Sequence, residues 1–69
     1  NQTIVDIGCG RGDVVGILTA AGHSVTGIEA DRSLVESGRA AGLRIVAGRA
    51  EELPLADESV DVIICSVVI

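Results

Sequence analysis

The sequence predicts an α/β fold in which crossover helices connect the strands of a parallel sheet. Short runs rich in Val and Ile alternate with segments whose apolar residues have helical spacing, and only a few residues connect them. The run Val62-Ile63-Ile64 is continuous, as in a strand buried on both faces. A chain of 69 residues fits a single domain, and we expect no boundary within residues 1–69.

Four strands and two helices are expected, in the order strand, helix, strand, helix, strand, strand. The first strand is a β-branched run that ends at Gly8. Gly22 and Gly42 follow the last turns of the two helices, and Asp13 and Asp31 are the expected N-caps. The expected strands are Thr3–Ile7, Ser24–Glu29, Leu43–Ala47 and Val60–Cys65, the helices are Asp13–Ala21 and a segment from Asp31 or Ser33 to Ala41, and Gly48–Ser59 is turn-rich.

Charge and composition make several functional classes poor candidates. Five arginines, no lysine and ten carboxylates give a net charge of -5, so direct binding of nucleic acid or of a membrane surface by this segment is not expected. The hydrophobic content of 48% indicates a folded chain, and the apolar tail Val62–Ile69 is shorter than the roughly 18 residues of a membrane span. No targeting signal is visible, so we expect a cytoplasmic protein. The absence of an initiating Met suggests an internal segment of a longer protein.

The stretch Asp6-Ile7-Gly8-Cys9-Gly10-Arg11-Gly12 lies between the first expected strand and the first helix. Ligands of parallel sheets bind at the carboxyl ends of the strands, and glycines let a ligand approach the backbone. Glu29 ends the second strand, 17 positions beyond Gly12, where a carboxylate can accept two hydrogen bonds from a ribose diol. Loop and acid together predict a site for a ribose-containing ligand.

Asp13 bears on the class of that ligand. The dinucleotide fingerprint G-x-G-x-x-G requires glycine at this position, and a carboxylate there would face the pyrophosphate. This disfavours NAD or FAD, although an NAD(P)-binding oxidoreductase fragment remains an alternative. A ligand with a ribose, an ammonium group and one carboxylate fits better, because Asp6 offers an anion to the ammonium while backbone amides take the carboxylate.

Three stretches resemble the class I S-adenosylmethionine-dependent methyltransferases, in particular the N-terminal cofactor-binding half of their small-molecule branch. They are VDIGCGRG at 5–12, GIEAD at 27–31 and GRAEELPLADESVDVIICS at 48–66. The resemblance implies a truncated Rossmann-like fold with strand order 3-2-1-4. It also implies S-adenosyl-L-methionine as cofactor and methyl transfer to a small-molecule acceptor. A catalytically inactive, methyltransferase-like binding module is the second alternative.

The resemblance also implies the roles of individual residues. Asp6, Gly8, Cys9 and Gly10 would surround the methionine part, with Gly12 in the same loop; Glu29 would hold the ribose hydroxyls, Ala30 and Ala50 would lie at the adenine, and Cys65 and Ser66 would border the site. Arg49 stands where the family commonly has an acid that accepts from the adenine amino group. Guanidinium has no acceptor, so Arg49 would stack on the ring or point to solvent, with Glu51 as a substitute acceptor. Catalytic residues are not identifiable.

The remaining polar residues have simpler interpretations. Cys9 and Cys65 follow neighbouring strands, but without a C-x-x-C motif we expect free thiols rather than a disulfide. His23 has no partner at metal-ligand spacing, so no metal site is predicted. The acids of 51–58 are interpreted as a solvated loop, with a hydrolytic carboxylate pair as the alternative. The fourth strand would be an exposed edge, through which we expect self-association.

Overall fold

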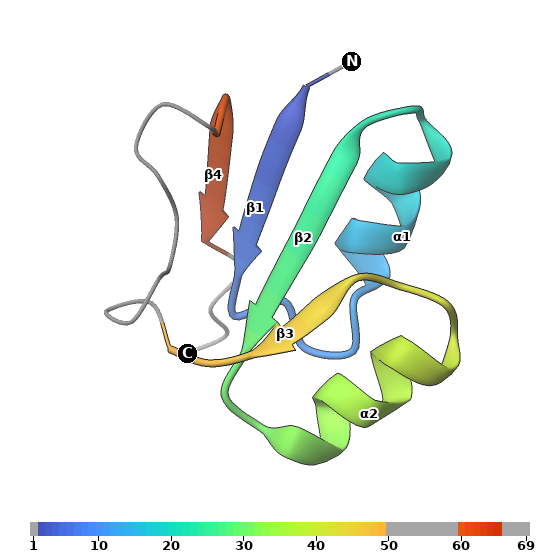
Figure 1. Cartoon of the computed structure of the whole chain (residues 1–69), viewed down its shortest axis with the longest axis vertical. Helices are drawn as coiled ribbons and strands as arrows, with labels where there is room; N and C mark the ends of the chain where they lie inside the picture. The colour runs from blue at the N-terminus through green and yellow to red at the C-terminus, as the bar shows by residue number, and fades with distance from the viewer. Residues whose placement is uncertain (1, 50–59, 66–69) are drawn as a thin grey trace.

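The computed structural model describes residues 2–49 and 60–65, which form one parallel sheet and two helices (Figure 1). The chain runs strand, helix, strand, helix, strand, strand, as predicted. The elements are β1 (Thr3–Ile7), α1 (Asp13–Ala20), β2 (Ser24–Glu29), α2 (Arg32–Ala40), β3 (Ile45–Ala47) and β4 (Val62–Cys65).

All three strand pairings are parallel, and the strand order is β3-β2-β1-β4. The predicted order 3-2-1-4 is therefore confirmed. β1 is central, with Ile7 paired to Ile28 of β2 on one side and to Cys65 of β4 on the other. This register brings the carboxyl ends of three strands to the same edge of the sheet.

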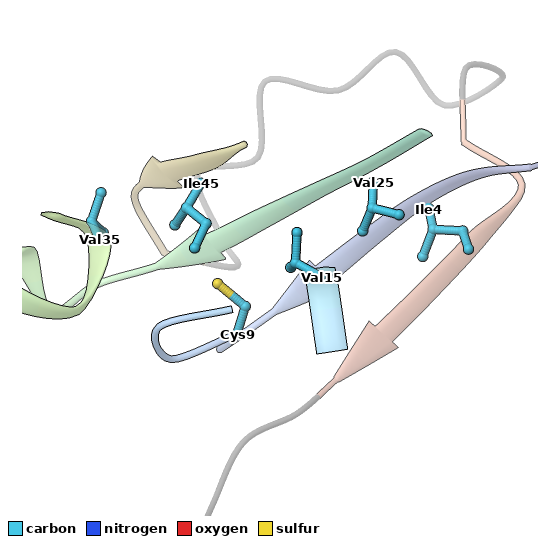
Figure 2. Close-up of a cluster of buried hydrophobic side chains, with 6 residues drawn as sticks. All are labelled: Ile4, Cys9, Val15, Val25, Val35 and Ile45. Carbon is cyan, nitrogen blue, oxygen red and sulfur yellow. The ribbon is translucent and has the colours of Figure 1, made fainter. Parts of the chain in front are cut away.

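Both helices pack on one face of the sheet around a small aliphatic core (Figure 2). Val15 of α1 and Val35 of α2 are buried against the strands, and Cys9 contributes from the loop after β1. The core contains no aromatic ring, because the chain has none. The buried cluster consists of Ile4, Cys9, Val15, Val25, Val35 and Ile45.

The helix starts confirm one predicted cap and correct the other. Asp31 is the N-cap of α2, and its carboxylate accepts hydrogen bonds from the backbone N–H and the hydroxyl of Ser33. Asp13 is not the N-cap of α1: Gly12 occupies that position and Asp13 is the first helical residue. The capping residue has a left-handed backbone, at φ 95°, which favours glycine over aspartate.

β3 and β4 are each two residues shorter than predicted at their amino ends. The N–H of Leu43 donates to the carbonyl of Gly38, so this residue belongs to the turn that ends α2. At β4 the carboxylate of Asp61 accepts from the N–H of Thr3, and its own N–H donates to the Thr3 carbonyl. These two bonds fix β4 beside β1 just before the regular strand begins.

Within the described residues, no helix is long and apolar enough to cross a membrane. In the same part of the chain, no group of three or more His, Cys, Asp or Glu side chains gathers as a metal site would require. Cys9 and Cys65 both carry free thiols, the first buried and the second exposed.

Candidate functional site

The loop after β1 turns back over the end of β2. The N–H groups of Gly8 and Cys9 both donate to the carbonyl of Ile28, at 2.8 and 3.2 Å. Gly8 and Gly10 have positive φ angles of 71° and 61°, which glycine adopts without the steric cost that a side chain would bring. The loop is therefore a tight strand-to-helix turn that only glycine accommodates at these two positions.

Glu29 lies at the end of β2 and is held by two backbone N–H groups. One carboxylate oxygen accepts from Gly10 at 2.8 Å, and the other accepts from Asp31 at 2.9 Å. An ionised carboxylate has about four acceptor positions, so each oxygen keeps one for another donor. The arrangement orients the carboxylate and leaves it able to accept from a diol.

Asp6 is fully buried in β1, on the same face of the sheet as the helices. It pairs in register with Gly27 of β2, so it lies beneath the glycine loop. Asp6 and Glu29 both act electrostatically on the thiol of Cys9. The site edge therefore carries two carboxylates, in keeping with a ligand that brings a positive group.

The thiol of Cys9 points into the core rather than toward the candidate site. Its side chain belongs to the core beneath the loop (Figure 2), and Sγ donates to the carbonyl of Gly10 at 3.5 Å. Burial, and then the charges of Asp6 and Glu29, raise the pKa of the Cys9 thiol to about 11. The sulfur is therefore a protonated packing group near neutral pH.

Gly27 was not among the site residues predicted from the sequence, yet it makes room for the loop. A Cβ at this position would lie 2.6 Å from Sγ of Cys9 and 3.0 Å from Val15. A glycine inside a strand is a sequence signal of such a close approach. That signal was available in the run Ser24–Glu29.

Gly12 faces the interior. Its Cβ position would meet Ile45 and Leu43 at 2.7 and 2.8 Å, so glycine is required here by packing as well as by its φ angle. As the N-cap it has no side-chain bond to the first turn of α1. The amides of Gly8, Cys9 and Gly10 are already bound within the protein, so the N–H groups of that first turn are the ones left to donate to an anion.

Of the other predicted site residues, some lie at the carboxyl end of the sheet and some lie outside the described residues. Ala30 is exposed directly after Glu29, and Cys65 is exposed at the end of β4, opposite Ile7. The N–H of Gly48 donates to the carbonyl of Glu29 at 3.0 Å, which brings the exposed Arg49 beside this edge. Ala50, Glu51 and Ser66, with the acids of 51–58, lie outside the described residues.

A glycine loop, a fixed acid at the end of β2 and the order 3-2-1-4 together define the site. Residues 5–69 match the methyltransferase domain family. The chain belongs to this family. The match includes the loop, Glu29 and β4 in a single alignment, which favours the methyltransferase interpretation over the NAD(P)-dependent one.

One relative is the ubiquinone/menaquinone biosynthesis C-methyltransferase UbiE of Rubrivivax gelatinosus, which is 41% identical over 68 residues. The match covers 94% of this chain and 27% of that protein, so the chain spans about a quarter of the relative's length.

Two solved structures of S-adenosylmethionine-dependent methyltransferases resemble the fold closely. The Methanosarcina mazei protein superposes with a TM-score of 0.82 at 29% identity, covering 91% of this chain and 35% of that one. The TehB-like protein of Corynebacterium glutamicum gives 0.80 at 28% identity, covering 94% and 36%.

Proposed function

We propose that this chain forms the cofactor-binding part of an S-adenosylmethionine-dependent methyltransferase that acts on a small-molecule acceptor. The observation that carries the proposal is the carboxylate of Glu29, fixed by the N–H groups of Gly10 and Asp31 at the mouth of a glycine loop. Family membership and the relative's role as a C-methyltransferase support it. We also propose a cytoplasmic location, as expected from the sequence.

The residues present suit this cofactor. Glu29 would accept from the two ribose hydroxyls with the acceptor position that each oxygen retains. The loop of Gly8, Cys9 and Gly10 would line the methionine part, where its glycines leave the backbone accessible. Asp6 would provide negative charge beneath the loop, opposite the ammonium group.

The adenine would lie over Ala30 and near Arg49, with Cys65 bordering the site from β4, and the backbone amide of Ala50, which lies outside the described residues, is a further contact predicted from the sequence. Ala30 is small and exposed, so it offers a flat apolar surface to a ring. Arg49 can stack its guanidinium on the ring or donate hydrogen bonds, but it cannot accept one. Adenine recognition in this chain therefore rests on stacking and backbone contacts more than on a side-chain acceptor.

When bound, the cofactor supplies a methyl group on a positively charged sulfur that the acceptor displaces. The contribution of this chain is to bind and orient. The fixed carboxylate at the ribose and the loop along the methionine hold the ligand at two points, and the rigid sheet edge sets the distance between them. The acceptor and any base would contact residues beyond this chain, in the remainder of a longer protein.

Calorimetric titration of the protein with S-adenosylhomocysteine tests the proposal, with NADH as the competing ligand class. We expect binding of S-adenosylhomocysteine and none of NADH. Glu29→Ala should weaken the binding by about 1–3 kcal/mol, the size of losing hydrogen bonds to a charged group. Glu36→Ala, which removes an exposed acid from α2, is the matched control and should leave the affinity unchanged.

A folded protein that binds NADH in place of S-adenosylhomocysteine would refute the proposal. Failure of a folded protein to bind either ligand would favour the inactive binding module, for which the departure at Arg49 is the main support.

A further inference from the structure

A pocket lies at the opposite end of the sheet from the glycine loop. It has a volume of about 350 Å³ and is formed where the turns after α1 and α2 meet the beginning of β2. Ser24 lines this pocket and Glu29 lies in the candidate cofactor site, five residues further along β2. At about 3.3 Å per residue the two sites are about 16 Å apart, so a ligand in one does not reach the other.

The pocket is lined by groups that donate hydrogen bonds. Arg44, His23, Thr19 and Ser24 are among its lining residues, each with a side chain that can donate a hydrogen bond, and none of the described carboxylates lines it. The whole chain has ten carboxylates and five arginines, so its net charge is negative. The described lining of this pocket instead has a cation and no carboxylate. Leu43 and the buried Val25 provide an apolar wall.

His23 is oriented so that it acts as a donor. Its Nδ1 accepts the backbone N–H of Gln2 at 3.0 Å, so the neutral ring carries its proton on Nε2. The same bond fixes the ring against the first residues of the chain. The pocket thus has a lining histidine whose ring is held by this bond and whose Nε2 can donate, together with the cation of Arg44.

Within the part of the chain that the structure describes, the Arg44 side chain forms no hydrogen bond or ion pair. By contrast, Arg11 lies 3.8 Å from Asp13, and Nε of Arg39 donates to the carbonyl of Ile45. The Arg44 backbone is nevertheless anchored, because its carbonyl accepts from Gly27 at 2.9 Å. Arg44 therefore lines the pocket from an anchored backbone, and its guanidinium has no partner among the described residues.

The turns after the two helices reduce the negative charge that the helix ends place beside the pocket. Both helices finish here, and uncapped carbonyls would place negative charge at the site. The N–H of His23 donates to the carbonyl of Leu18 and that of Leu43 to the carbonyl of Gly38. These carbonyls are therefore already satisfied by the turns.

We propose that this pocket binds the phosphate of a small phosphomonoester. Arg44 would pair with the phosphate, and His23 with the hydroxyls of Thr19 and Ser24 would donate to its remaining oxygens. A free phosphate fills little of the volume, whereas a phosphate on a small organic group also uses the wall of Val25 and Leu43. The site is separate from the proposed cofactor site, so occupation of one should not displace the ligand of the other.

NMR titration of the whole protein with glycerol 3-phosphate, and with glycerol and sodium chloride of equal ionic strength as controls, tests the proposal. We expect saturable shifts of backbone amides at residues 22–25 and 42–44 with the phosphomonoester alone. Arg44→Gln should weaken its binding about tenfold or more, the effect of losing a charge-assisted hydrogen bond. Arg44→Lys, which keeps the charge, should lie between this variant and the original protein.

Arg32→Gln is the matched control, because it removes the same charge from an exposed position outside this pocket. It should leave binding unchanged. The proposal is overturned if the shifts do not saturate, if Arg32→Gln weakens binding as much as Arg44→Gln, or if S-adenosylhomocysteine displaces the phosphomonoester. Saturable shifts at residues 8–13 alone would place the anion at the glycine loop and also overturn it.

Discussion

The carboxylate of Glu29 connects two segments of the site that are distant in sequence. Its oxygens accept from Gly10, in the loop after β1, and from Asp31, the residue that caps α2. The bond to Gly10 holds the loop in a backbone conformation that only glycine favours. We therefore expect Glu29 to shape the site before any ligand arrives, in addition to accepting from the ribose.

Glu29→Gln should show this structural role in the ligand-free protein. A carboxamide has one acceptor oxygen, so its NH2 group would face one of the two N–H donors. We expect the free energy of unfolding to fall by about 1 kcal/mol or more, and the amide of Gly10 or Asp31 to exchange faster with solvent. Glu36→Gln should change neither quantity. Unchanged exchange at both amides in Glu29→Gln would contradict the role.

Cys9 and Cys65 differ in reactivity for reasons that the structure makes explicit. The pKa of the Cys9 thiol is raised from 9.0 to about 11, because burial and two nearby carboxylates disfavour the thiolate. The folded state therefore holds this proton more tightly than the unfolded state does. Its contribution to stability is fully present below about pH 9 and is lost as the pH rises toward about 11.

Thiol labelling of the folded protein at pH 8 should modify the exposed Cys65 first and leave Cys9 unmodified until the protein unfolds. Mass spectrometry of the labelled peptides gives the order. The free energy of unfolding of a Cys9→Ser variant, measured from pH 8 to 11, should fall less with rising pH than that of the original protein. Rapid labelling of Cys9 in the folded state would show that its thiol is not buried.

At the scale of elements, two helical glycines have opposite surroundings. A Cβ on Gly16 of α1 would find Leu43 at an ordinary contact distance of 3.6 Å. A Cβ on Gly38 of α2 would clash with Ile45 and would lie 2.8 Å from the carbonyl oxygen of Arg11. The second contact is with backbone, which cannot move without displacing the glycine loop. Gly38 therefore sets the distance between α2 and the candidate site.

Gly16→Ala should raise the free energy of unfolding by up to about 1 kcal/mol, because alanine favours the helix and its Cβ would meet Leu43 without a clash. Gly38→Ala should lower it by about 1–3 kcal/mol through overpacking, and should also weaken S-adenosylhomocysteine binding. Chemical denaturation and calorimetry measure the two effects. Equal effects of both substitutions would contradict the packing described for α2.

The comparison of sequence with structure is most informative for these elements. Local patterns predicted β1 and β2 to the residue, because each is a β-branched run that glycine or an acid ends. They placed the N-cap of α1 at Asp13. The structure has Gly12 there, with a left-handed backbone and with Ile45 and Leu43, distant in sequence, too close for a side chain. The role of Gly27 in accommodating Cys9 is likewise a tertiary contact. The sequence predicted Glu29 as a ribose-binding residue, but it did not predict the hydrogen bonds of Glu29 with Gly10 and Asp31.

At the scale of the whole molecule, β4 is the edge strand of the sheet formed by the described residues, and it has no charged side chain. It pairs with β1 on one side, and its own residues are Val62-Ile63-Ile64-Cys65. Ile63 is 57% exposed. Such an edge offers unpaired backbone groups and apolar side chains to another chain. Self-association of the 69-residue chain through β4 remains our prediction.

Ile63→Lys should reduce concentration-dependent association of the 69-residue chain, because a charge on an edge strand opposes pairing with a second strand. Ile17→Lys provides the control: this side chain is 69% exposed but lies on α1. Sedimentation velocity across a range of concentrations measures the association of both variants, and only Ile63→Lys should reduce it. A monodisperse monomer of the unmodified chain with a cooperative thermal melt would refute the prediction.

The central claim is that the edge formed by the glycine loop and Glu29 binds S-adenosylmethionine. A crystal structure of the protein with S-adenosylhomocysteine tests it most directly. We expect both ribose hydroxyls within hydrogen-bond distance of the Glu29 carboxylate, the methionine part along the loop from Gly8 to Gly10, and the adenine beside Ala30. Electron density for the ligand elsewhere, or a ribose that does not contact Glu29, would contradict the account.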